Sequence, residues 1–397
     1  MISVEEATRI LLEHKIDVPN TLVPLEQALG RVLREDLVAD RDFPPFDRVT
    51  MDGIAIHFDA FASGRRSFPV RAVGAAGAPQ ATLSDREGCV EIMTGAMLPE
   101  GADTVIRYED LTMENGRATV GTEEVTRGQN IHRQGIDRQK GSIVVPSGRL
   151  LGSAEIGVAA TVGRQHLRVA QFPPAIIISS GDELVDVYRT PLPHQIRKSN
   201  EHRLRATLRN WGIPADTAHL VDDPDIIRRR MEEFLGQYRV IIMSGGVSEG
   251  KFDFIPQALE ALGVRRLFHK IRQRPGKPFW FGIHPQGTLV FALPGNPVSS
   301  FLCTLRYFHP WMLASLGLTR RQPYAVLAWD LHFKPDLTYF AQVRLEYASD
   351  GTLTAIPAEG HGSGDLANLV DADAFIELPR GQDLFRKGEA YPVWIYR

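Results

Sequence analysis

Between residues 172 and 322, short apolar runs alternate with helical patterns, and this alternation constrains the fold more than any other feature. Runs such as 175–178 and 240–243 are continuously apolar, as expected of strands that are buried on both faces. Buried strands that alternate with helices form a mostly parallel sheet covered by helices on both sides. The strands expected are 175–178, 219–221, 240–243, 267–271 and 288–292, and the helices are 200–211, one that starts at 222–224, 254–262 and 298–307.

The chain on either side of this α/β domain has the pattern of mostly β structure. Ser3 and Glu6 form a capping box for one helix, after which short apolar runs alternate with glycine-rich turns as far as Gln171. Beyond Gln322, alternating residues around an Asp350-Gly351 turn predict a hairpin. We expect a discontinuous N-terminal linker domain, an inserted β-rich domain, the α/β domain and a small C-terminal β domain, over residues 1–47 with 134–171, 48–133, 172–322 and 323–397.

Charge and composition exclude several classes of protein. The 397 residues carry 45 basic and 48 acidic side chains, so no positive excess is available to neutralise a nucleic-acid backbone. No apolar run approaches the ~18 residues of a membrane helix, and the acidic N-terminus is unlike a signal peptide. Cys89 and Cys303 form neither a disulfide framework nor a metal-ligand spacing. We expect a cytoplasmic protein that binds neither nucleic acid nor membranes.

Five loops are expected at one edge of the α/β sheet. Ligands of an open parallel sheet bind at the carboxyl ends of its strands, in the loops that lead onward. Each of the five loops follows a predicted strand or connects two strands. Their sequences are Ser179-Ser180-Gly181-Asp182-Glu183, Asp222-Asp223-Pro224, Ser244-Gly245-Gly246-Val247-Ser248, Arg274-Pro275-Gly276-Lys277-Pro278 and Leu293-Pro294-Gly295-Asn296-Pro297.

These loops combine an anion-binding backbone with side chains of both charges. Gly245, Gly246 and Ser248 offer amides and a hydroxyl that suit a phosphate. Carboxylates repel an anionic ligand unless a cation lies between them, and a hard divalent cation such as Mg²⁺ is the usual solution. The residues alone therefore predict metal-assisted chemistry on a phosphorylated ligand. The cations are Arg274 and Lys277, and the acids are Glu183, Asp222 and Asp253.

Simpler structural roles remain open for each loop. A Gly-Gly pair after a strand is often only a tight turn, and residues 182–183 and 222–223 suit helix caps. Residues 294–297 suit a rigid turn before the last helix, and the basic residues suit an ordinary solvated surface. The functional interpretation is favoured because five such loops fall on one predicted edge, which separate turns would not require.

Short motifs rich in glycine, proline and acidic residues run along the whole chain. They are Pro44-Pro45-Phe46-Asp47 leading to Met51-Asp52-Gly53, Ile92-Met93-Thr94-Gly95, Gly128-Gln129-Asn130-Ile131 with Gly135-Ile136-Asp137, Ser180-Gly181-Asp182-Glu183-Leu184, Gly245-Gly246-Val247-Ser248 with Asp253, Pro275-Gly276-Lys277-Pro278 and Leu293-Pro294-Gly295-Asn296-Pro297. In this order and spacing they resemble the molybdopterin molybdenumtransferase family, which includes the C-terminal domain of gephyrin. One motif alone is weak evidence, whereas the full series is specific.

The resemblance implies a reaction of adenylylated molybdopterin with molybdate, assisted by Mg²⁺. The pterin dithiolene takes up molybdenum while the adenylate link is hydrolysed, which releases AMP and molybdenum cofactor. The resemblance also implies a homodimer, in which the N-terminal part of one subunit faces the α/β domain of the other. It further implies a molybdopterin adenylyltransferase as a partner protein.

Matched position by position, the resemblance implies site residues in both halves of the chain. The catalytic positions fall on Asp52, Thr94, Asp137, Glu183, Asp222, Asp253, Lys270 and Arg274, with Glu183 and Asp253 in the metal pocket and Lys270 and Arg274 facing molybdate or phosphate. The substrate-binding positions fall on Ser180, Gly181, Asp182, Gly245, Gly246, Ser248, Lys277, Pro294, Gly295, Asn296 and Pro297.

The residues alone favour structural roles for the N-terminal set. Asp52-Gly53 has the pattern of a hairpin turn, Thr94 ends a predicted strand, and residues 135–137 suit a turn. The chain also departs from the family pattern at several positions, which bear on substrate affinity more than on reaction type. The departures are Val49 in place of Ser, Ile54 in place of Tyr, Lys198 in place of an acid or small polar residue, Glu249 in place of an apolar residue and Arg274 in place of Lys.

Two other functions remain open at this point. A non-catalytic pterin-binding carrier or scaffold would keep the substrate cradle without turnover, and a product assay separates it from the enzyme. A hydrolase of some other nucleotide diphosphate is a weaker alternative, because α/β domains of this type serve varied ligands. The residues do not decide between molybdate and tungstate.

Overall fold

A computed structural model describes residues 1–246, 254–358 and 364–397. The chain divides into a first unit, made of Met1–Thr21, Gly30–Val32 and Val169–Arg397, and a second unit, made of Leu22–Leu29 and Leu33–Arg168. The predicted fold class is confirmed, because a central α/β domain is preceded by a β-rich region and followed by a small β domain. None of the helices in these residues has the length and apolar character needed to cross a membrane.

The α/β domain of the first unit is built on a sheet with the strand order β16-β13-β17-β21-β20-β18 among the described residues. The first four strands are parallel, as predicted, and β20 is antiparallel to both β21 and β18. Strand β18 therefore points the same way as the parallel strands. The bounds are β13 Ala175–Ser180, β16 Ala215–Leu220, β17 Val240–Ser244, β18 Arg265–His269, β20 Trp280–Ile283 and β21 Leu289–Leu293, with a small parallel pair of β14 Leu184–Val185 and β15 Ile196–Arg197.

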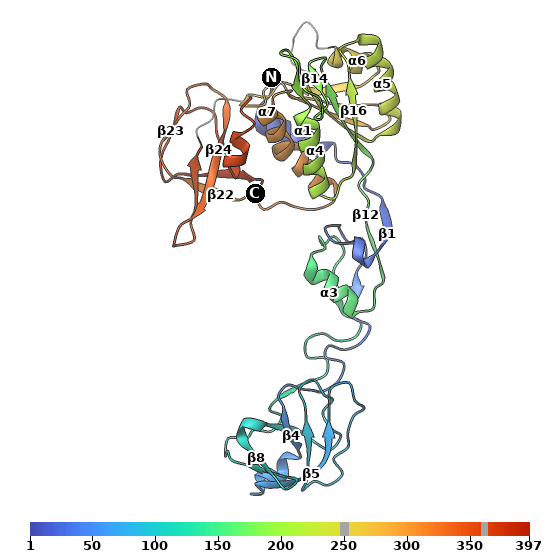
Figure 1. Cartoon of the computed structure of the whole chain (residues 1–397), viewed down its shortest axis with the longest axis vertical. Helices are drawn as coiled ribbons and strands as arrows, with labels where there is room; N and C mark the ends of the chain where they lie inside the picture. Colours follow the sequence, from blue (N-terminus) through green and yellow to red (C-terminus); the bar gives the residue numbers. More distant parts are fainter. Residues whose placement is uncertain (247–253, 359–363) are drawn as a thin grey trace. The chain divides into compact units, whose positions relative to one another are not determined.

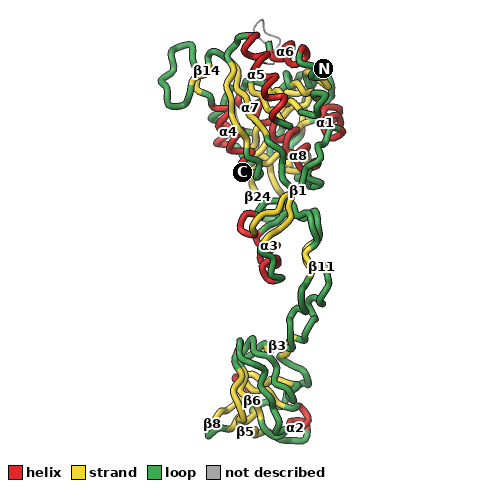
Figure 2. The backbone as a smooth tube through the Cα atoms, turned by 90° about the vertical axis from the view of Figure 1, so that its right-hand side faces the viewer, coloured by secondary structure: helices red, strands yellow, loops and turns green. Residues whose placement is uncertain are grey.

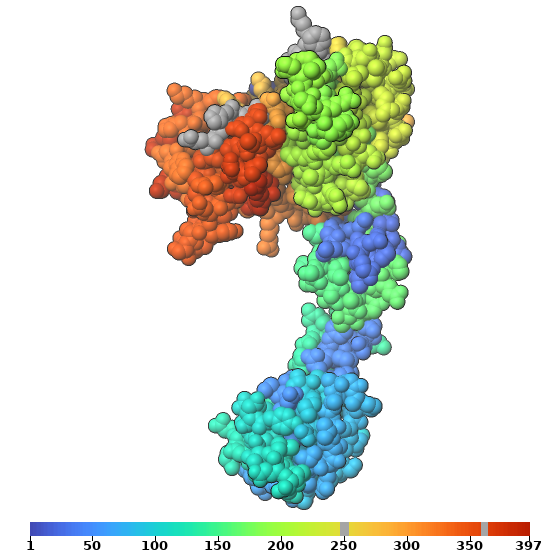
Figure 3. Space-filling model, viewed as in Figure 1, coloured from blue at the N-terminus to red at the C-terminus, as the bar shows by residue number. Residues whose placement is uncertain are grey.

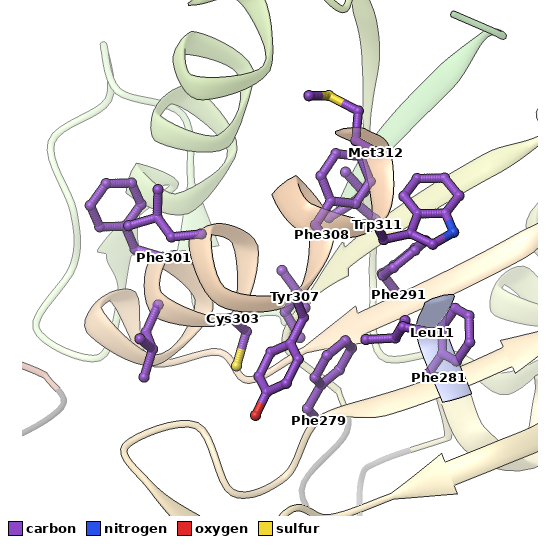
Figure 4. Packing of buried hydrophobic residues seen from close by; sticks show 14 of the residues in the cluster. Leu11, Phe279, Phe281, Phe291, Phe301, Cys303, Tyr307, Phe308, Trp311 and Met312 are labelled. Carbon is purple, nitrogen blue, oxygen red and sulfur yellow. The ribbon is translucent and has the colours of Figure 1, made fainter. Parts of the chain in front are cut away.

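Helices cover both faces of this sheet, which explains why its strands are continuously apolar. Ile176 and Ile178 of β13 pack in a cluster with residues of α5 and α6, whereas Ile177 packs in the opposite cluster with α1, α4, α7 and α8. Figure 1 shows these helices on the two sides of the sheet, and Figure 4 shows the aromatic packing around Phe291 and Trp311. The bounds are α1 Val4–Glu13, α4 Ser199–Asn210, α5 Pro224–Gln237, α6 Ile255–Ala261, α7 Pro297–Cys303 and α8 His309–Ser315.

Local signals set where several of these helices begin and end. The Ser3 hydroxyl accepts from the Glu6 amide at the start of α1, and the Asp223 carboxylate caps α5 ahead of Pro224. The last helix differs from the prediction of one helix over 298–307. It ends as an α-helix at Cys303, continues as a π-helical segment over Thr304–Phe308 and then becomes α8. Apolar spacing does not reveal such a change of helical hydrogen bonding.

The C-terminal domain is a small β barrel. The predicted hairpin is confirmed, because β24 and β25 pair across the Asp350-Gly351 turn, and a pairing of β24 with β26 closes the sheet. Strand β19, which follows β18 in the chain, pairs in parallel with the start of β24. Residues 324–358 and 364–397 make up most of the orange and red surface in Figure 3. The bounds are β19 Gln273–Arg274, β22 Tyr324–Leu327, β23 Leu331–His332, β24 Thr338–Tyr347, β25 Leu353–Pro357, α9 Asn368–Asp371, β26 Ala374–Leu378, β27 Leu384–Phe385 and β28 Ala390–Ile395.

The second unit contains a sheet with the strand order β7-β4-β6-β5-β9-β8 and a helix, α2 (Figure 2). Two short strand pairs, β3 with β10 and β2 with β11, and helix α3 complete it, and the chain passes between the units through β1 and β12. The bounds are β1 Asn20–Pro24, β2 Leu37–Val38, β3 Arg48–Val49, β4 Gly53–Ile56, α2 Phe58–Ala62, β5 Ser67–Gly74, β6 Cys89–Ile92, β7 Thr104–Arg107, β8 Leu111–Glu114, β9 Arg117–Val120, β10 Ile131–His132, β11 Ile143–Val145, α3 Ser153–Thr161 and β12 His166–Ala170.

One buried ion pair ties the barrel to the α/β domain. Arg306, in the π-helical segment, bonds both carboxylate oxygens of Glu377 at 2.8 and 3.2 Å. Thr8 of α1 and Trp394 of β28 complete the network at 3.0 and 2.7 Å. The two charged side chains are only 9% and 14% exposed, so each depends on the other for its charge to be balanced.

Replacing Glu377 by Ala should leave the Arg306 guanidinium buried without its counter-charge. We expect the free energy of unfolding of the full chain, measured with urea, to fall by about 3–5 kcal/mol. Glu233→Ala is the matched control, because its pair with Arg230 is 43% exposed on both sides and should contribute about 1 kcal/mol or less. Equal effects of the two substitutions would contradict this account of the network.

Candidate active site

A cavity of about 450 Å³ lies at the carboxyl edge of the α/β sheet. The loops that follow β13, β16, β17 and β21 meet there, together with the segment that enters α4. The structure thus brings four of the five predicted loops together at one cavity, which the fifth loop also reaches through Pro278, and we call it the acidic cavity. Its lining includes Ser180, Gly181, Glu183, Asp222, Gly245, Gly246, Pro294, Gly295, Asn296 and Pro297 from the predicted set, and Lys198, Asn200 and Glu201 in addition.

The fifth loop lines a second cavity, of about 590 Å³, on the barrel side of the same edge. The two cavities adjoin, since Pro278, Pro294 and Asn296 line both. Arg274 and Lys277 are the charged side chains of the second lining, and no carboxylate of the described residues belongs to it. We call it the basic cavity. Val298 and Ser299 of α7 also line it, and the barrel supplies a further part of its wall through Phe333, Leu337, Tyr339, Phe340, Gln342, Ala358 and Asn368.

The barrel wall of the basic cavity was not foreseen from the sequence. Phe333 and Tyr339 stack with ring centroids 4.1 Å apart, and the pairing of β19 with β24 places Arg274 opposite Tyr339. Burial raises the pKa of the Tyr339 phenol, and the nearby Arg274 charge opposes that shift. The amide atoms Oε1 of Gln342 and Nδ2 of Asn368 are buried in this wall without a hydrogen-bond partner among the described residues.

Glycine is required at the turn that follows β17. Gly245 has φ +99°, and a Cβ atom there would lie 2.8 Å from the carbonyl oxygen of Ser180. Its amide donates to the Leu293 carbonyl at 3.2 Å, so the expectation of a free amide is wrong for Gly245. The amides of Gly246 and Gly295 have no partner among the described residues, so they are available as donors to an anion in the acidic cavity.

The acids of the acidic cavity have different surroundings. The exposed Glu183 carboxylate makes no hydrogen bond or ion pair to the described residues, whereas Asp222 accepts from the Ser180 hydroxyl at 3.3 Å. Glu201 accepts from Ser179 at 3.3 Å. Asp223 caps the N-terminus of α5. Asp222 therefore does not have the capping role that was considered as an alternative for this pair. Three carboxylates of the described residues therefore line the cavity, and Glu183 is the least constrained of them.

Lys198 brings a cation to the same lining. Its ammonium group lies 2.8 Å from the Asp186 carboxylate, and the Lys198 side chain is only 13% exposed. This pair lowers the pKa of Asp186, to which the Tyr188 hydroxyl also donates. Burial, with a smaller contribution from Lys198, lowers the pKa of His219, whose Nδ1 lies 3.3 Å from the Ser179 hydroxyl. The departure from the family pattern at Lys198 is thus balanced by a local acid.

Several predicted residues lie elsewhere. Ser248 and Asp253 lie outside the described residues. Lys270 lines neither cavity, and its backbone has φ +70°. Asp182 also lines neither cavity, and its carboxylate accepts from the Asp222 amide at 3.1 Å. Among the residues with described positions, no three His, Cys, Asp or Glu side chains are grouped as a ready metal site.

Asp52, Thr94 and Asp137 belong to the second unit. The interpretation of Asp52-Gly53 as a hairpin turn is wrong, because β3 pairs with β10 while β4 pairs with β6 and β7. The Asp52 carboxylate instead accepts from the Thr94 amide at 2.6 Å, so these two predicted residues lie together. Asp137 lies 3.1 Å from His132 Nε2.

Glycine at position 53 allows this arrangement. A Cβ atom there would lie 1.9 Å from the carbonyl oxygen of Ile106 on the neighbouring strand β7. The backbones of β4 and β7 thus approach too closely for any other residue. Asp52 is consequently held at the start of β4, where the Tyr108 amide donates to its carbonyl at 3.0 Å.

Comparisons with known proteins agree with this architecture. Three family models match successive parts of the chain: the MoeA N-terminal region (domain I and II) over residues 2–163, a probable molybdopterin binding domain over 176–314, and the MoeA C-terminal region (domain IV) over 324–396. A crystal structure of the molybdopterin biosynthesis moea protein from Pyrococcus horikosii covers 100% of this chain and 99% of its own, with a TM-score of 0.82 and 28% identity.

Relatives from several organisms share one name, and their similarity to this chain extends over its whole length. The Molybdopterin molybdenumtransferase of Synechocystis is 38% identical over 399 residues, which span 100% of both chains. The Molybdopterin molybdenumtransferase of Bacillus subtilis is 32% identical over 411 residues, which span 100% of this chain and 94% of the relative. In chain order, a β-rich region, an α/β domain of the molybdopterin-binding type and a small β domain follow one another, and this combination defines the class of protein. The chain belongs to the molybdopterin molybdenumtransferase family of enzymes.

The contact between Asp52 and Thr94 predicts a pH-dependent contribution to stability. Hydrogen bonds from Thr94, the backbone amide first, hold the pKa of the Asp52 carboxyl below its ordinary value. The pKa of Asp52 is lower in the folded protein than in the unfolded chain. Its contribution to stability is therefore complete above the unfolded-state pKa and is lost as the pH falls through the folded-state pKa. Asp52→Asn should therefore melt at a lower temperature than wild type at pH 7, and the difference should vanish in acid.

Asp17→Asn is the control for this measurement, because Asp17 is exposed and makes no hydrogen bond or ion pair to the described residues. Its melting temperature should follow that of wild type at every pH. A difference between Asp52→Asn and wild type that persists unchanged from pH 7 into acid would show that the carboxylate charge is not responsible.

Proposed function

We propose that the enzyme inserts molybdenum from molybdate into adenylylated molybdopterin and hydrolyses the adenylate link, which yields AMP and molybdenum cofactor. One observation carries the proposal: the acidic and basic cavities adjoin along Pro278, Pro294 and Asn296. A reaction between an oxyanion and a diphosphate ester brings two anionic reactants together. Two adjoining cavities with different charge allow each reactant to bind in its own cavity beside the other.

The basic cavity suits the oxyanion. Arg274 and Lys277 provide the positive charge there, and no described carboxylate opposes them. A guanidinium offers two parallel N–H donors to an oxyanion, whereas the ammonium acts as a point charge. We assign molybdate to this cavity. The assignment of Lys270 to molybdate loses support, since its side chain lines neither cavity.

The acidic cavity suits the diphosphate of the adenylylated pterin. The free amides of Gly246 and Gly295 are donors for phosphate oxygens. The donor set also fits Mg²⁺, because the carboxylates of Glu183 and Asp222 are hard oxygen ligands and that of Glu183 has no partner among the described residues. When bound, Mg²⁺ would offset the charge of the diphosphate as the P–O–P bond breaks.

The reaction balances with one water consumed and one released. Two Mo–S bonds form between molybdate and the dithiol, and one oxo group leaves as water with the two thiol protons. A second water enters the P–O–P bond, which breaks to give AMP and the phosphate of molybdopterin. In this scheme Glu183 and Asp222 orient the diphosphate, and Arg274 and Lys277 hold the oxyanion beside it.

The remaining assignments concern the assembly. Asp52, Thr94 and Asp137 lie in the second unit, and we assign them to the site of a partner subunit in a homodimer. The contact between Asp52 and Thr94 supports a common role for these two residues. We further propose that the enzyme acts in the cytoplasm and receives its substrate from a molybdopterin adenylyltransferase.

Replacing Glu183 by Ala should remove the unpaired carboxylate from the acidic cavity. We expect AMP release and molybdenum cofactor formation to fall by about 100-fold or more, as is typical when a group that acts on the transition state is removed. Asp52→Ala and Asp253→Ala test the other predicted acids in the same assay. Glu232→Ala, an exposed acid on α5, should leave both products unchanged. Wild-type rates in all three site variants would contradict the proposed catalytic activity. Pterin binding by the wild-type chain without AMP release would indicate a non-catalytic carrier.

Replacing Arg274 by Ala should raise the molybdate concentration that gives half the maximal rate by about tenfold, because one of the two cations of the basic cavity is lost. The concentration of adenylylated molybdopterin needed should change much less. Arg272→Ala is the matched control, since Arg272 is exposed two residues earlier and lines neither cavity. An equal effect of both substitutions on the two substrates would contradict the assignment of molybdate to this cavity.

A further inference from the structure

Arg203 is a half-buried residue directly behind the acidic cavity. It lies on α4, and its Nη2 donates to the Asn200 side-chain oxygen at 3.0 Å and to the Ser300 hydroxyl at 2.8 Å. Its Nε and Nη1 atoms are buried and have no hydrogen-bond partner among the described residues. Arg203 does not line the cavity, and it belongs to none of the motifs described in the sequence analysis.

The two partners of Arg203 hold the cavity wall. Asn200 donates from Nδ2 to the Ser244 hydroxyl at 2.8 Å and to the Gly295 carbonyl at 2.6 Å, which joins the end of β17 to the loop after β21. Ser300 lies on α7 within reach of the Asn296 carbonyl, at 3.2 Å. Asn200, Ser244, Gly295 and Asn296 all line the acidic cavity. The side chain of Asn200 therefore separates the guanidinium from the cavity.

The charge of Arg203 is not balanced by an acid of the described residues. No ion pair forms there with the described residues, and Arg203 instead lies over the Phe301 ring, whose centroid is 5.2 Å from the Arg203 Cζ atom. Burial lowers the pKa of Arg203 to about 10, so the side chain remains charged at neutral pH. A buried and unpaired cation is costly to a folded protein unless an opposite charge arrives. The cavity on the other side of Asn200 is where an anionic ligand would bring that charge.

We infer that Arg203 is a positioning residue that fixes Asn200 and supplies, from behind the wall, the positive charge against which the diphosphate of the substrate binds. The choice of a diphosphate rests on the proposed function, whereas the need for an anion rests on the unpaired guanidinium. A purely structural Arg203, which only ties α4 to α7, is the competing explanation.

Pyrophosphate binding separates the two explanations. In titration calorimetry of the full chain, Arg203→Met should bind inorganic pyrophosphate about tenfold or more weakly than wild type, because the buried charge is lost. Arg203→Lys keeps the charge and should stay within about threefold of wild type. Arg209→Met is the matched control, because it removes one exposed, unpaired charge from the same helix and should leave the affinity within about twofold.

Two further measurements exclude a simple loss of folding. The urea midpoint of each variant is recorded without ligand, and the salt dependence of pyrophosphate binding should be smaller in Arg203→Met than in wild type. A lower midpoint in both Arg203 variants with unchanged pyrophosphate affinity would show a structural role and overturn the inference. A wild-type chain that does not bind pyrophosphate, or an Arg203→Lys variant that binds as weakly as Arg203→Met, would also overturn it.

The inference and the proposed function fail in different ways. If wild type binds pyrophosphate through Arg203 but forms neither AMP nor molybdenum cofactor, the inference stands and the proposed function fails. If the products form but Arg203→Met changes neither the affinity for pyrophosphate nor its salt dependence, the proposed function stands and the inference fails.

Discussion

The parallel pairing of β13, β17 and β21 is the constraint on which the candidate site depends. Their register places Ser179 beside Ser244 and Ser244 beside Leu293, so the three strands end at the same level. Chain segments more than 100 residues apart therefore begin their loops at one edge. The glycine turn at Gly245 and the bridge formed by Asn200 then fix how closely those loops approach one another.

A second pairing adds the barrel to this edge. Because β19 runs in parallel beside β24, the loop that carries Lys277 extends from the α/β domain onto the barrel, and the buried Arg306–Glu377 pair reinforces the junction. The consequence is a separation of charge. The described carboxylates of the two linings all lie in the acidic cavity, together with Arg197 and Lys198, whereas the charged residues of the basic cavity are the cations Arg274 and Lys277.

Local signals in the sequence predicted much of this fold. Continuous apolar runs marked β13 and β17, Asp223 with Pro224 marked the start of α5, and Asp350-Gly351 marked a hairpin. Features set by distant contacts were not predictable in this way. The partner strands of β4 contradict the hairpin expected at Asp52, and the burial of Arg203 and the role of Tyr339 depend on elements far away in the chain. The loop sequences indicated which residues meet at the edge, but not that two cavities share them.

A crystal of the full chain soaked with molybdate and AMP tests the central claim, which is the division of the site into two charged compartments. The account predicts a tetrahedral oxyanion within hydrogen-bond distance of Arg274 and Lys277, and an AMP phosphate at the amides of Gly246 and Gly295, with Asn296 between the two ligands. Both anions bound in one cavity, or molybdate held at a surface remote from Pro278 and Pro294, would contradict it.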